Sequence, residues 1–314
     1  MAAAHPEARF RFCYRPHRYI RSWLESLPRN ARRCLLAEPL GPGGAQLFHG
    51  LNQRLPAIAM PRCVATFHDL FVMTSEYSTP DFRARFTRQA RDAASRATAV
   101  IAVSEFTRRQ VIAHLGVAPE RVRVVHHGIR HLGRAEGQRE RVILNVGAIQ
   151  KRKNIAGLVS AFETVGADWR LVLAGSAGYG SEEILARIAG SPARDRIAVL
   201  GYIPPGELAG WYARCSIFAF PSLDEGFGMP VLEAMAAGAP VLTSNCSALP
   251  EVAGDAALLV DPGNAEAMGE ALRHLTQSEE LRRDLARRGG LRAQLFTWEK
   301  SVRETWDVYQ QILG

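Results

Sequence analysis

Short, fully apolar runs alternate with longer polar segments that carry one apolar stripe, and this alternation constrains the fold most strongly. In the first half, the apolar runs predict buried strands and the segments between them have helical spacing. The predicted strands are 64–67, 98–103 and 121–125, and the predicted helices are 80–96 and 105–115, the latter capped by Ser104. Buried strands separated by amphipathic helices indicate parallel sheets in an α/β fold.

The same alternation restarts at residue 142, which indicates a second domain of similar construction. The predicted strands there are 142–146, 171–174, 198–200, 217–220, 240–243 and 257–260. The predicted helices are 154–165 (capped by Asn154), 182–188, 207–212, 230–237, 264–276, 279–296 and 298–313. Residues 130–141 are polar, charged and contain glycine, so we predict the linker there.

We therefore expect two doubly wound α/β domains that face a cleft. The N-terminal domain is predicted over residues 1–133, the C-terminal domain over 142–297, and a C-terminal crossover helix over 298–314. A chain of 314 residues suits two domains of about 150 residues each. Ligands of such sheets bind beyond the carboxyl ends of the strands, so the residues at these ends are the first candidates for a site.

Composition excludes several classes of protein. With 47% hydrophobic and 22% charged residues, the chain is globular rather than disordered. Its apolar runs are shorter than the roughly 20 residues that a membrane-spanning helix needs, and residues 1–19 lack the apolar core of a signal peptide. Five widely spaced cysteines without a CxxC pair indicate a reducing compartment, with neither a disulfide framework nor a metal site.

Positive charge is concentrated in the first half of the chain. Residues 1–140 carry 22 Arg and 11 acidic residues, a balance of +11, whereas residues 141–314 carry a balance of −3. This asymmetry indicates an anionic partner for the first half or a solvated basic face. The aromatic residues lie mostly in apolar strands or helix stripes rather than between basic residues, which argues against a nucleic-acid groove.

The strongest candidate site is the segment 221–235, PSLDEGFGMPVLEAM, where a predicted strand gives way to a predicted helix. Gly226 and Gly228 permit close backbone approach to a ligand. Pro230 suits the first turn of a helix, whose free N–H groups favour an anion such as phosphate. Glu225 and Glu233, with seven residues between them, can contact two ends of one hydroxyl-rich ligand. The alternative is a carboxylate that stabilises the helix dipole and an ordinary exposed helix residue.

Cationic and histidine side chains follow two other predicted strands. Lys151, Arg152 and Lys153 come after strand 142–146, where cations suit phosphate, although a solvated basic loop has the same composition. His68 follows strand 64–67, and a single histidine there is by itself more often structural. The segment 175–180, GSAGYG, is spaced GxxGxG rather than GxGxxG, so the dinucleotide-binding fingerprint is absent.

Residues 218–233 resemble the E-x7-E signature of retaining glycosyltransferases of family 4, which have the two-domain GT-B fold. The resemblance spans residues 48–312, is densest over 142–262, and is closest to the bacterial mannosyltransferase-like branch that builds surface polysaccharides. It is also carried by Asn145-Val146-Gly147, Arg152-Lys153-Asn154, Leu249-Pro250-Glu251-Val252, His68-Asp69-Leu70 and Val103-Ser104-Glu105-Phe106. A GT-B nucleotide-sugar epimerase and a catalytically impaired sugar-nucleotide-binding protein remain as alternatives.

The resemblance implies a role for each candidate residue. Glu225 resembles the glutamate that faces the donor sugar and His68 the histidine that reaches this sugar from the first domain, so these two are the predicted catalytic residues. Glu233 resembles the glutamate that binds the ribose of the nucleotide. The other predicted donor-binding residues are Gly147, Arg152, Lys153, Gly226, Phe227, Gly228 and Met229, with Arg152 and Lys153 as the clamp on the diphosphate.

The implied reaction is transfer of a hexose, preferably mannose from GDP-mannose, to a hydroxyl of a lipid-linked saccharide with retention of configuration. No cofactor or metal is implied besides the nucleotide-sugar donor, because positive side chains and a helix N-terminus can stabilise the leaving diphosphate. The expected location is the cytoplasm, peripherally at the inner face of the cytoplasmic membrane. The partner of the basic half is then an anionic bilayer surface rather than nucleic acid.

The sequence departs from the family pattern at two places. Members begin with a strand, a glycine-containing loop and a helix, and no such segment precedes Arg9, so the N-terminal domain is predicted to be incomplete. The segment 10–14 resembles the second strand of the family. The arginine that often follows the first glycine of the second domain is replaced by Ala148, so phosphate neutralisation is expected to depend more on Arg152 and Lys153.

Overall fold

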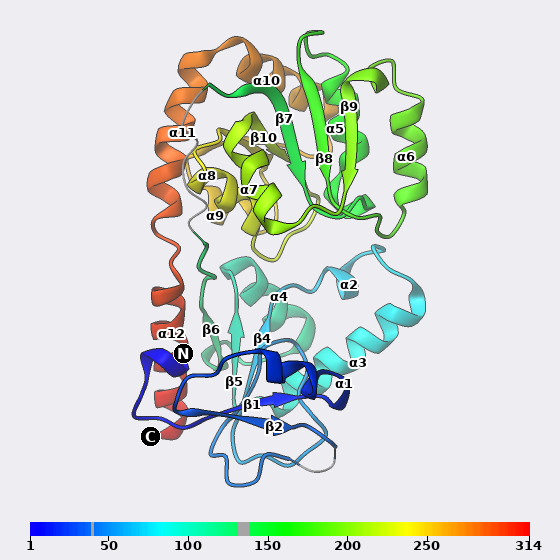
Figure 1. Cartoon of the computed structure of the whole chain (residues 1–314). Helices are drawn as coiled ribbons and strands as arrows, with labels where there is room; N and C mark the ends of the chain where they lie inside the picture. The colour runs from blue at the N-terminus through cyan, green and yellow to red at the C-terminus, as the bar shows by residue number, and fades with distance from the viewer. Residues whose placement is uncertain (39–40, 131–137) are drawn as a thin grey trace.

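The computed structural model describes residues 1–38, 41–130 and 138–314, which form two helix-flanked domains around parallel sheets (Figure 1). The larger sheet has six strands in the order β12-β11-β10-β7-β8-β9. These are β7 Glu140–Val146, β8 Arg170–Ala174, β9 Ile197–Gly201, β10 Cys215–Phe220, β11 Val241–Ser244 and β12 Ala257–Val260. The strand order reverses between β7 and β10, and in doubly wound sheets ligands bind at such a reversal.

Helices cover both faces of the larger sheet. The helices are α5 Ile155–Phe162, α6 Ser181–Ala189, α7 Pro205–Arg214, α8 Met229–Ala236, α9 Leu249–Ala253, α10 Ala265–Gln277 and α11 Glu279–Ala293. Successive residues of β7 point to opposite faces: Ile143 packs among residues of α5, α6 and α10, and Leu144 among residues of α7, α8 and α9. Burial of both faces explains why these strands are apolar throughout rather than alternating.

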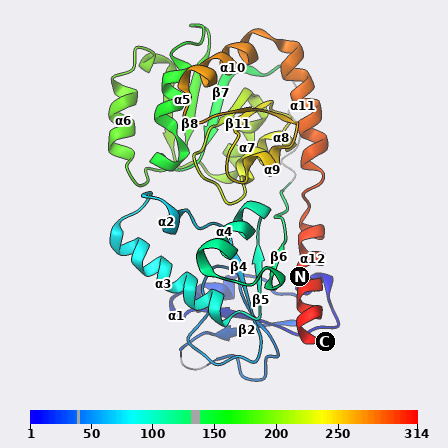
Figure 2. The same ribbon diagram turned by 180° about the vertical axis from the view of Figure 1, so that it is seen from behind.

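The smaller sheet has four strands that follow chain order. They are β3 Phe48–Gly50, β4 Cys63–Phe67, β5 Ala99–Ala102 and β6 Val122–Val124. Helices α3 Pro80–Arg96 and α4 Glu105–Leu115 pack on one face. The last helix, α12 Trp298–Leu313, returns to the first domain, as Figures 1 and 2 show, and its Val308 packs against Val64 and Ile101 on the other face.

The chain crosses between the domains at two places that lie side by side. The N–H of Ile129 donates to the carbonyl of Phe296 at 3.1 Å. A Cβ at Gly128 would lie 2.1 Å from the backbone nitrogen of Trp298, so only glycine permits this approach. The segment before β7 and the segment before α12 are therefore packed together.

A separate pair of parallel strands precedes the smaller sheet. These strands are β1 Phe10–Tyr14 and β2 Ala31–Leu35, with Cys13 opposite Cys34. The crossover between them contains the short helices α1 Pro16–Tyr19 and η2 Arg21–Leu24. The pair is attached to the C-terminal helix through His5, whose ring stacks on Trp306 at a centroid distance of 3.9 Å. All five cysteines are free.

The predicted α/β class is confirmed, whereas some local details differ. Asn154 does not cap α5: it has a φ of 52°, and its side-chain amide donates to the carbonyl of Pro262 instead. Ser104 does cap α4, because its hydroxyl accepts from the N–H of Thr107. Residues 131–137 of the predicted linker lie outside the described residues, and its last two residues already belong to β7.

The elements that the sequence did not predict are short. Apart from single 3-10 turns such as η2, they are the strands β2 and β3 and the α-helices α1, α2 (Phe71–Thr74) and α9. None is long enough for a periodic pattern to stand out. In the part of the chain that the structure describes, no helix combines the length and the apolar character needed to cross a bilayer.

Candidate active site

The loop after β10 and the start of α8 form the centre of the candidate site. Strand β10 is buried along its whole length and ends at Phe220. Gly228 precedes α8 with a φ of 108°, which favours glycine, and a Cβ there would lie 2.8 Å from the Leu249 side chain. Pro230 occupies the first turn, where its missing N–H costs no hydrogen bond. Met229, the first residue of α8, is half-buried.

A buried carboxylate lies between two buried cations at this loop. Lys153 Nζ lies 2.5 Å from Glu225 Oε1, and Arg152 Nη1 lies 2.8 Å from Glu225 Oε2. All three residues are at most 8% exposed. Burial alone would raise the pKa of Glu225, but the charges and hydrogen bonds of Lys153 and Arg152 outweigh it and hold the pKa below its usual value. The structure thus joins three of the predicted site residues into an ionised cluster with one net positive charge.

Aromatic rings support both cations of this cluster. The Lys153 ammonium lies 4.5 Å from the ring centroid of Phe220, and the Arg152 guanidinium lies 4.2 Å from that of Phe71. Phe71 belongs to α2 of the first domain, so the cationic cluster already contacts both domains. Gly147 leaves room for the lysine, since a Cβ there would lie 3.1 Å from Lys153 Cε.

Two further carboxyl groups, Asp69 and Asp224, lie within the electrostatic reach of the cluster. Burial raises the pKa of Asp69 to about 6, against the opposing effect of Arg152. Burial likewise raises the pKa of Asp224 to about 6. Three acidic side chains therefore surround two cations, and the sequence analysis assigned a role to only one of the three, Glu225.

The backbone of Gly226 connects the loop to the first domain. Its carbonyl accepts hydrogen bonds from Ser104 Oγ at 2.6 Å and Thr107 Oγ1 at 3.1 Å. A Cβ at Gly226 would lie 1.7 Å from the carbonyl oxygen of His68. Hence the loop that carries Glu225 is docked against the end of β4 and the start of α4.

His68 lies beside this loop, but both of its ring nitrogens are engaged within the first domain. Its Nε2 lies 2.9 Å from the carbonyl oxygen of Leu51, and its Nδ1 lies 3.1 Å from His127 Nε2. Since a carbonyl only accepts, His68 donates from Nε2, and in the neutral ring its Nδ1 then accepts from His127. Burial, and then the charges of His68 and His126, lower the pKa of His127 to about 4, which agrees with a neutral ring.

Phe227 fills the space between the two domains. Its ring meets the ring of His127 edge-on at a centroid distance of 5.3 Å and contacts Phe296 at 5.8 Å. It is 5% exposed. In this arrangement Phe227 packs against protein rather than presenting its ring to solvent.

Glu233 lies apart from the cluster of Glu225. It projects from α8 toward α7, where its carboxylate accepts a hydrogen bond of 2.9 Å from Tyr212. Tyr212 is fully buried. Burial raises the pKa of Glu233, and the tyrosine only partly offsets this effect. The two glutamates of the predicted motif thus face different surroundings, one bound by cations and the other by a phenol.

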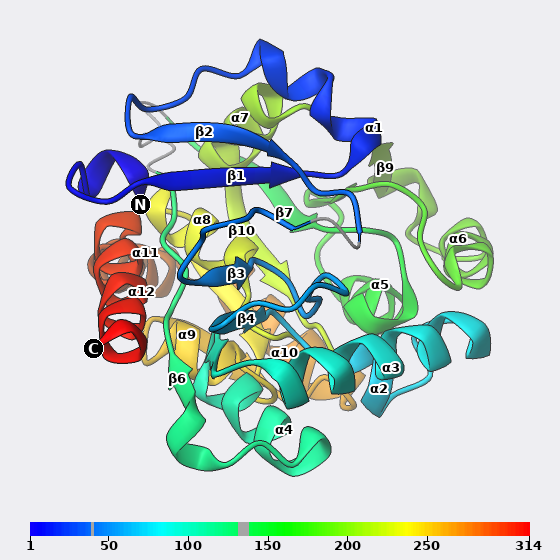
Figure 3. The same ribbon diagram turned by 90° about the horizontal axis from the view of Figure 1, so that it is seen from below.

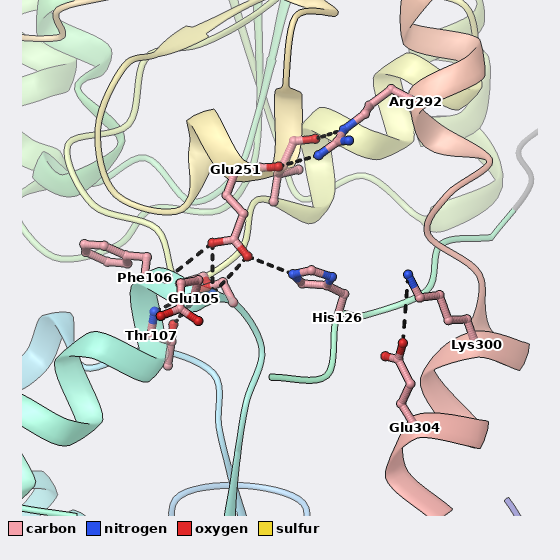
Figure 4. A network of polar contacts seen from close by, with 11 residues as sticks. Glu105, Phe106, Thr107, His126, Glu251, Arg292, Lys300 and Glu304 are labelled. Carbon is pink, nitrogen blue, oxygen red and sulfur yellow. Dashed lines mark hydrogen bonds and ion pairs between the residues drawn. The ribbon is translucent and has the colours of Figure 1, made fainter. Parts of the chain in front are cut away.

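Glu251 forms a second connection between the domains (Figure 4). From α9 of the second domain, its carboxylate accepts from the backbone N–H groups of Glu105, at 2.9 Å to each oxygen, and of Phe106 at 3.3 Å. His126 Nε2 lies 2.8 Å from Glu251 Oε1. Burial raises the pKa of Glu251, but these hydrogen bonds outweigh it, so the pKa lies below its usual value. Because α4 begins at Glu105, the carboxylate occupies the positive end of that helix.

A side chain of helix α11 holds Glu251 in place by hydrogen bonds to the backbone of α9. Arg292 donates from Nε to the carbonyl of Val252 at 2.9 Å and from Nη2 to the carbonyl of Glu251 at 2.5 Å, as Figure 4 shows. The same view shows Lys300 and Glu304, an i,i+4 pair on α12 at 3.9 Å. The guanidinium of Arg292 therefore fixes α9 where its glutamate can reach α4.

Comparison with known proteins identifies the family. The protein-family model "Glycosyl transferases group 1" matches residues 129–292, and the family model "Glycosyltransferase Family 4" matches residues 3–131. The O-antigen chain mannosyltransferase B of Escherichia coli is 30% identical over 282 residues, which cover 84% of this chain and 74% of the relative. The chain belongs to this glycosyltransferase family.

Other relatives of the glycosyltransferase differ in length. The serotype-specific mannosyltransferase WbdA of Escherichia coli is 26% identical, and the match covers 82% of this chain but only 35% of WbdA. Among solved structures, sucrose-phosphate synthase of Thermosynechococcus elongatus superposes with a TM-score of 0.73 at 24% identity, covering 86% of this chain and 74% of that one. Anabaena HepE in complex with UDP-glucose superposes with a TM-score of 0.68 at 19% identity, and the match covers 80% of this chain and 72% of HepE. These likenesses confirm the predicted GT-B fold.

Several polar groups around the site of this glycosyltransferase were not among the predicted site residues. Asp69 and Glu251 lie in motifs that carried the family resemblance, and Asp69 also follows the end of β4, so both residues had a usable signal. Asp224 precedes Glu225 directly. Tyr212 gave no signal, because its approach to Glu233 depends on how α7 packs against α8.

Proposed function

We propose that this glycosyltransferase transfers mannose from GDP-mannose to a hydroxyl of a lipid-linked saccharide during the biosynthesis of a surface polysaccharide. The observation that carries the proposal is the buried cluster of Glu225, Arg152 and Lys153 at the carboxyl end of the central strands. The relatives named O-antigen chain mannosyltransferase B and serotype-specific mannosyltransferase WbdA support the choice of mannose.

The cluster has the chemistry that a nucleotide-diphosphate sugar requires. The two cations and the N-terminus of α8 attract a diphosphate, whose two negative charges exceed the single charge of Glu225. The diphosphate then competes with Glu225 for Lys153. A carboxylate released in this way can accept hydrogen bonds from the hydroxyls of the sugar, which is the role proposed for Glu225.

The other proposed contacts are with the remaining parts of the donor. Glu233 binds the ribose hydroxyls, and the backbone of residues 226–228 approaches the sugar and the pyrophosphate. Gly147 and Met229 border the space beside Lys153 and the start of α8. His68 reaches the sugar after its Nδ1 hydrogen bond with His127 opens, because both of its ring nitrogens are bonded in the present arrangement.

We propose a retaining reaction without a metal ion. Arg152, Lys153 and the start of α8 stabilise the leaving diphosphate electrostatically. Electrostatic stabilisation of this kind is strong in a site that excludes water. The acceptor hydroxyl attacks on the face from which the diphosphate departs, and the departing phosphate takes the hydroxyl proton. Glu225 is surrounded by cations, so we assign it to sugar binding rather than to attack on the sugar.

A thermal-shift panel with GDP-mannose, UDP-glucose and ADP-glucose tests the donor. At 100 times its Kd, the true donor stabilises the folded protein by about 2.7 kcal/mol, and we expect this for GDP-mannose. Turnover with a lipid-linked saccharide then separates the transferase from a binding protein, and conversion of the free nucleotide sugar to an epimer would identify an epimerase instead. Stabilisation by the UDP or ADP sugar alone would contradict the choice of donor but not the family.

A further inference from the structure

The crossover between β1 and β2 carries large apolar side chains that the protein does not cover. Ile20 is 80% exposed, Trp23 64% and Leu24 92%. All three lie at or within the short helical turns that follow β1. Single exposed apolar residues are ordinary, but three within five positions form a patch that marks an interaction surface.

Arginines surround this apolar patch. Residues 15–33 contain six arginines and a single acidic residue. Five of the arginines are exposed, and among the described residues none of these five forms an ion pair; they are Arg15, Arg18, Arg21, Arg29 and Arg32. The acidic residue, Glu25, accepts a hydrogen bond of 2.8 Å from Tyr14. The positive charge of the crossover is therefore available to an external anion.

A hollow with a volume of about 480 Å³ opens beside the patch. Its lining includes Tyr19, Trp23, Arg29, Arg32 and Arg33. The Arg33 guanidinium lies 5.0 Å from the Trp23 ring centroid, and its Nε donates to the carbonyl of Ser22 at 2.9 Å. These contacts fix one guanidinium and one indole ring at the rim, with two unpaired guanidiniums next to them. This combination suits a phosphate group with an apolar body attached.

We propose that residues 15–33, hereafter the crossover patch, dock the protein on an anionic phospholipid bilayer. Ile20, Trp23 and Leu24 enter the boundary between headgroups and acyl chains, where amphipathic aromatic rings are favoured. Arg29 and Arg32 contact lipid phosphates at the hollow. Arginines near an anionic surface strengthen binding to it. Binding to a partner by charge alone would not need the exposed aliphatic side chains, whereas insertion of these side chains into a bilayer explains them.

The position of the crossover patch agrees with this assignment. Figures 1 and 3 show α1 and the β1–β2 pair within the first domain, on the opposite side from α4. Glu251 and the cluster of Glu225 belong to the second domain and face the α4 side of the first domain. Docking of the crossover patch on a bilayer therefore leaves the candidate active site uncovered. The inference extends the proposed function, since a lipid-linked acceptor lies at such a surface. It can be tested without donor or acceptor, so its failure and that of the proposed function are distinguishable.

Co-sedimentation with phosphatidylcholine vesicles, with and without phosphatidylglycerol, tests the proposal on the full chain. We expect binding to the anionic vesicles only, and a blue shift of tryptophan emission that Trp23→Phe removes. The pair Arg29→Ala and Arg32→Ala should weaken binding roughly thirtyfold. The pair Ile20→Ser and Leu24→Ser should also weaken it and leave the melting temperature unchanged, because both side chains are almost free of protein contact.

Matched variants separate the crossover patch from the general basicity of the first half. Arg88→Ala with Arg91→Ala removes the same charge from exposed positions on α3, and Leu291→Ser with Leu295→Ser removes exposed apolar residues from the second domain. Both controls should change binding less than twofold. Three outcomes would each overturn the proposal. The first is an equal loss of vesicle binding in the α3 variant, and the second is full competition by inorganic phosphate at constant ionic strength. The third is self-association of the protein without vesicles that Ile20→Ser and Leu24→Ser abolish.

Discussion

The backbone of Gly226 lies against the carbonyl oxygen of His68, so closely that a Cβ at position 226 would lie 1.7 Å from that oxygen. One residue belongs to the loop that carries Glu225, and the other to the end of a strand in the first domain. This contact, together with the hydrogen bonds from Ser104 and Thr107 to the same glycine, sets the distance between the domains at the candidate site.

Gly226→Ala should therefore separate the domains at the site without unfolding either of them. Because a displacement of about 1 Å can cost a hundredfold in rate, we expect kcat/KM to fall at least that much. Solution scattering should show a larger radius of gyration. Gly206→Ala is the matched control, since nothing lies within 4 Å of a Cβ there; if both variants kept full activity, the contact would have no part in catalysis.

Glu251→Ala should weaken the connection between α9 and α4. The change removes a carboxylate that accepts from two backbone N–H groups and pairs with His126, and charge-assisted hydrogen bonds of this kind contribute about 1.5–3 kcal/mol. We expect a loss of that size in the free energy of unfolding and a fall in activity. Glu304→Ala, which removes a half-exposed pair on α12, should cost about 0.5 kcal/mol or less. Equal losses in the two variants would contradict the interdomain role.

Lys153→Ala should affect stability and donor binding together. Breaking a buried pair by removal of one partner costs about 3–5 kcal/mol, and the additional change Glu225→Gln should recover part of this loss. At a temperature where the variant is folded, calorimetry should show a larger loss of affinity for the nucleotide-diphosphate sugar than for the nucleoside. Lys151→Ala, next to it in sequence but exposed and paired with Glu183, should leave both properties unchanged. Equal losses for the two ligands would refute the clamp.

A test of Glu233 must take Tyr212 into account. Glu233→Ala leaves the buried Tyr212 hydroxyl without its acceptor, which costs about 1–3 kcal/mol of stability before any ligand is added. The double variant with Tyr212→Phe removes this cost, so it should recover stability while nucleotide affinity remains low. Recovery of affinity along with stability would show that Glu233 supports the fold rather than binding the ribose.

The raised pKa values of Asp69 and Asp224 predict a pH dependence of stability. Both carboxyls have a pKa of about 6 in the folded chain, above the 3.8 that is usual for an aspartate. Between roughly pH 4 and 6 the folded state therefore holds more protons than the unfolded state, and stability decreases as the pH rises through this window. Each group contributes about 3 kcal/mol at most.

Denaturant titrations of Asp69→Asn at pH 4, 5, 6 and 7 check this dependence. Between pH 4 and 6, the stability of the variant should decrease less than that of the parent chain. Asp195→Asn, at an exposed carboxylate, serves as the control and should leave the slope as it is. An unchanged slope in Asp69→Asn would mean that this carboxyl is solvated in the folded protein.

Local sequence accounts for the elements that are long or strongly apolar. Helices α3, α4 and α12 begin and end where the apolar spacing predicts, and β12 has the predicted bounds. The turn into α8 follows from Gly228 and Pro230, whose backbone requirements are intrinsic to the residues. Local reasoning was wrong at Asn154, because its backbone is left-handed and its side-chain amide donates to the carbonyl of Pro262, more than a hundred residues away.

The sequence by itself determined the α/β class, the strand-to-helix turn with its two glutamates and the cations that follow β7, because these depend on residue type and short-range spacing. Only the tertiary structure decided which groups meet. It placed Glu225 between Arg152 and Lys153, Glu233 on Tyr212, Glu251 on α4 and Gly226 on His68. Each of these contacts joins residues from different strands or helices, so each depends on how the sheets and domains pack rather than on spacing along the chain.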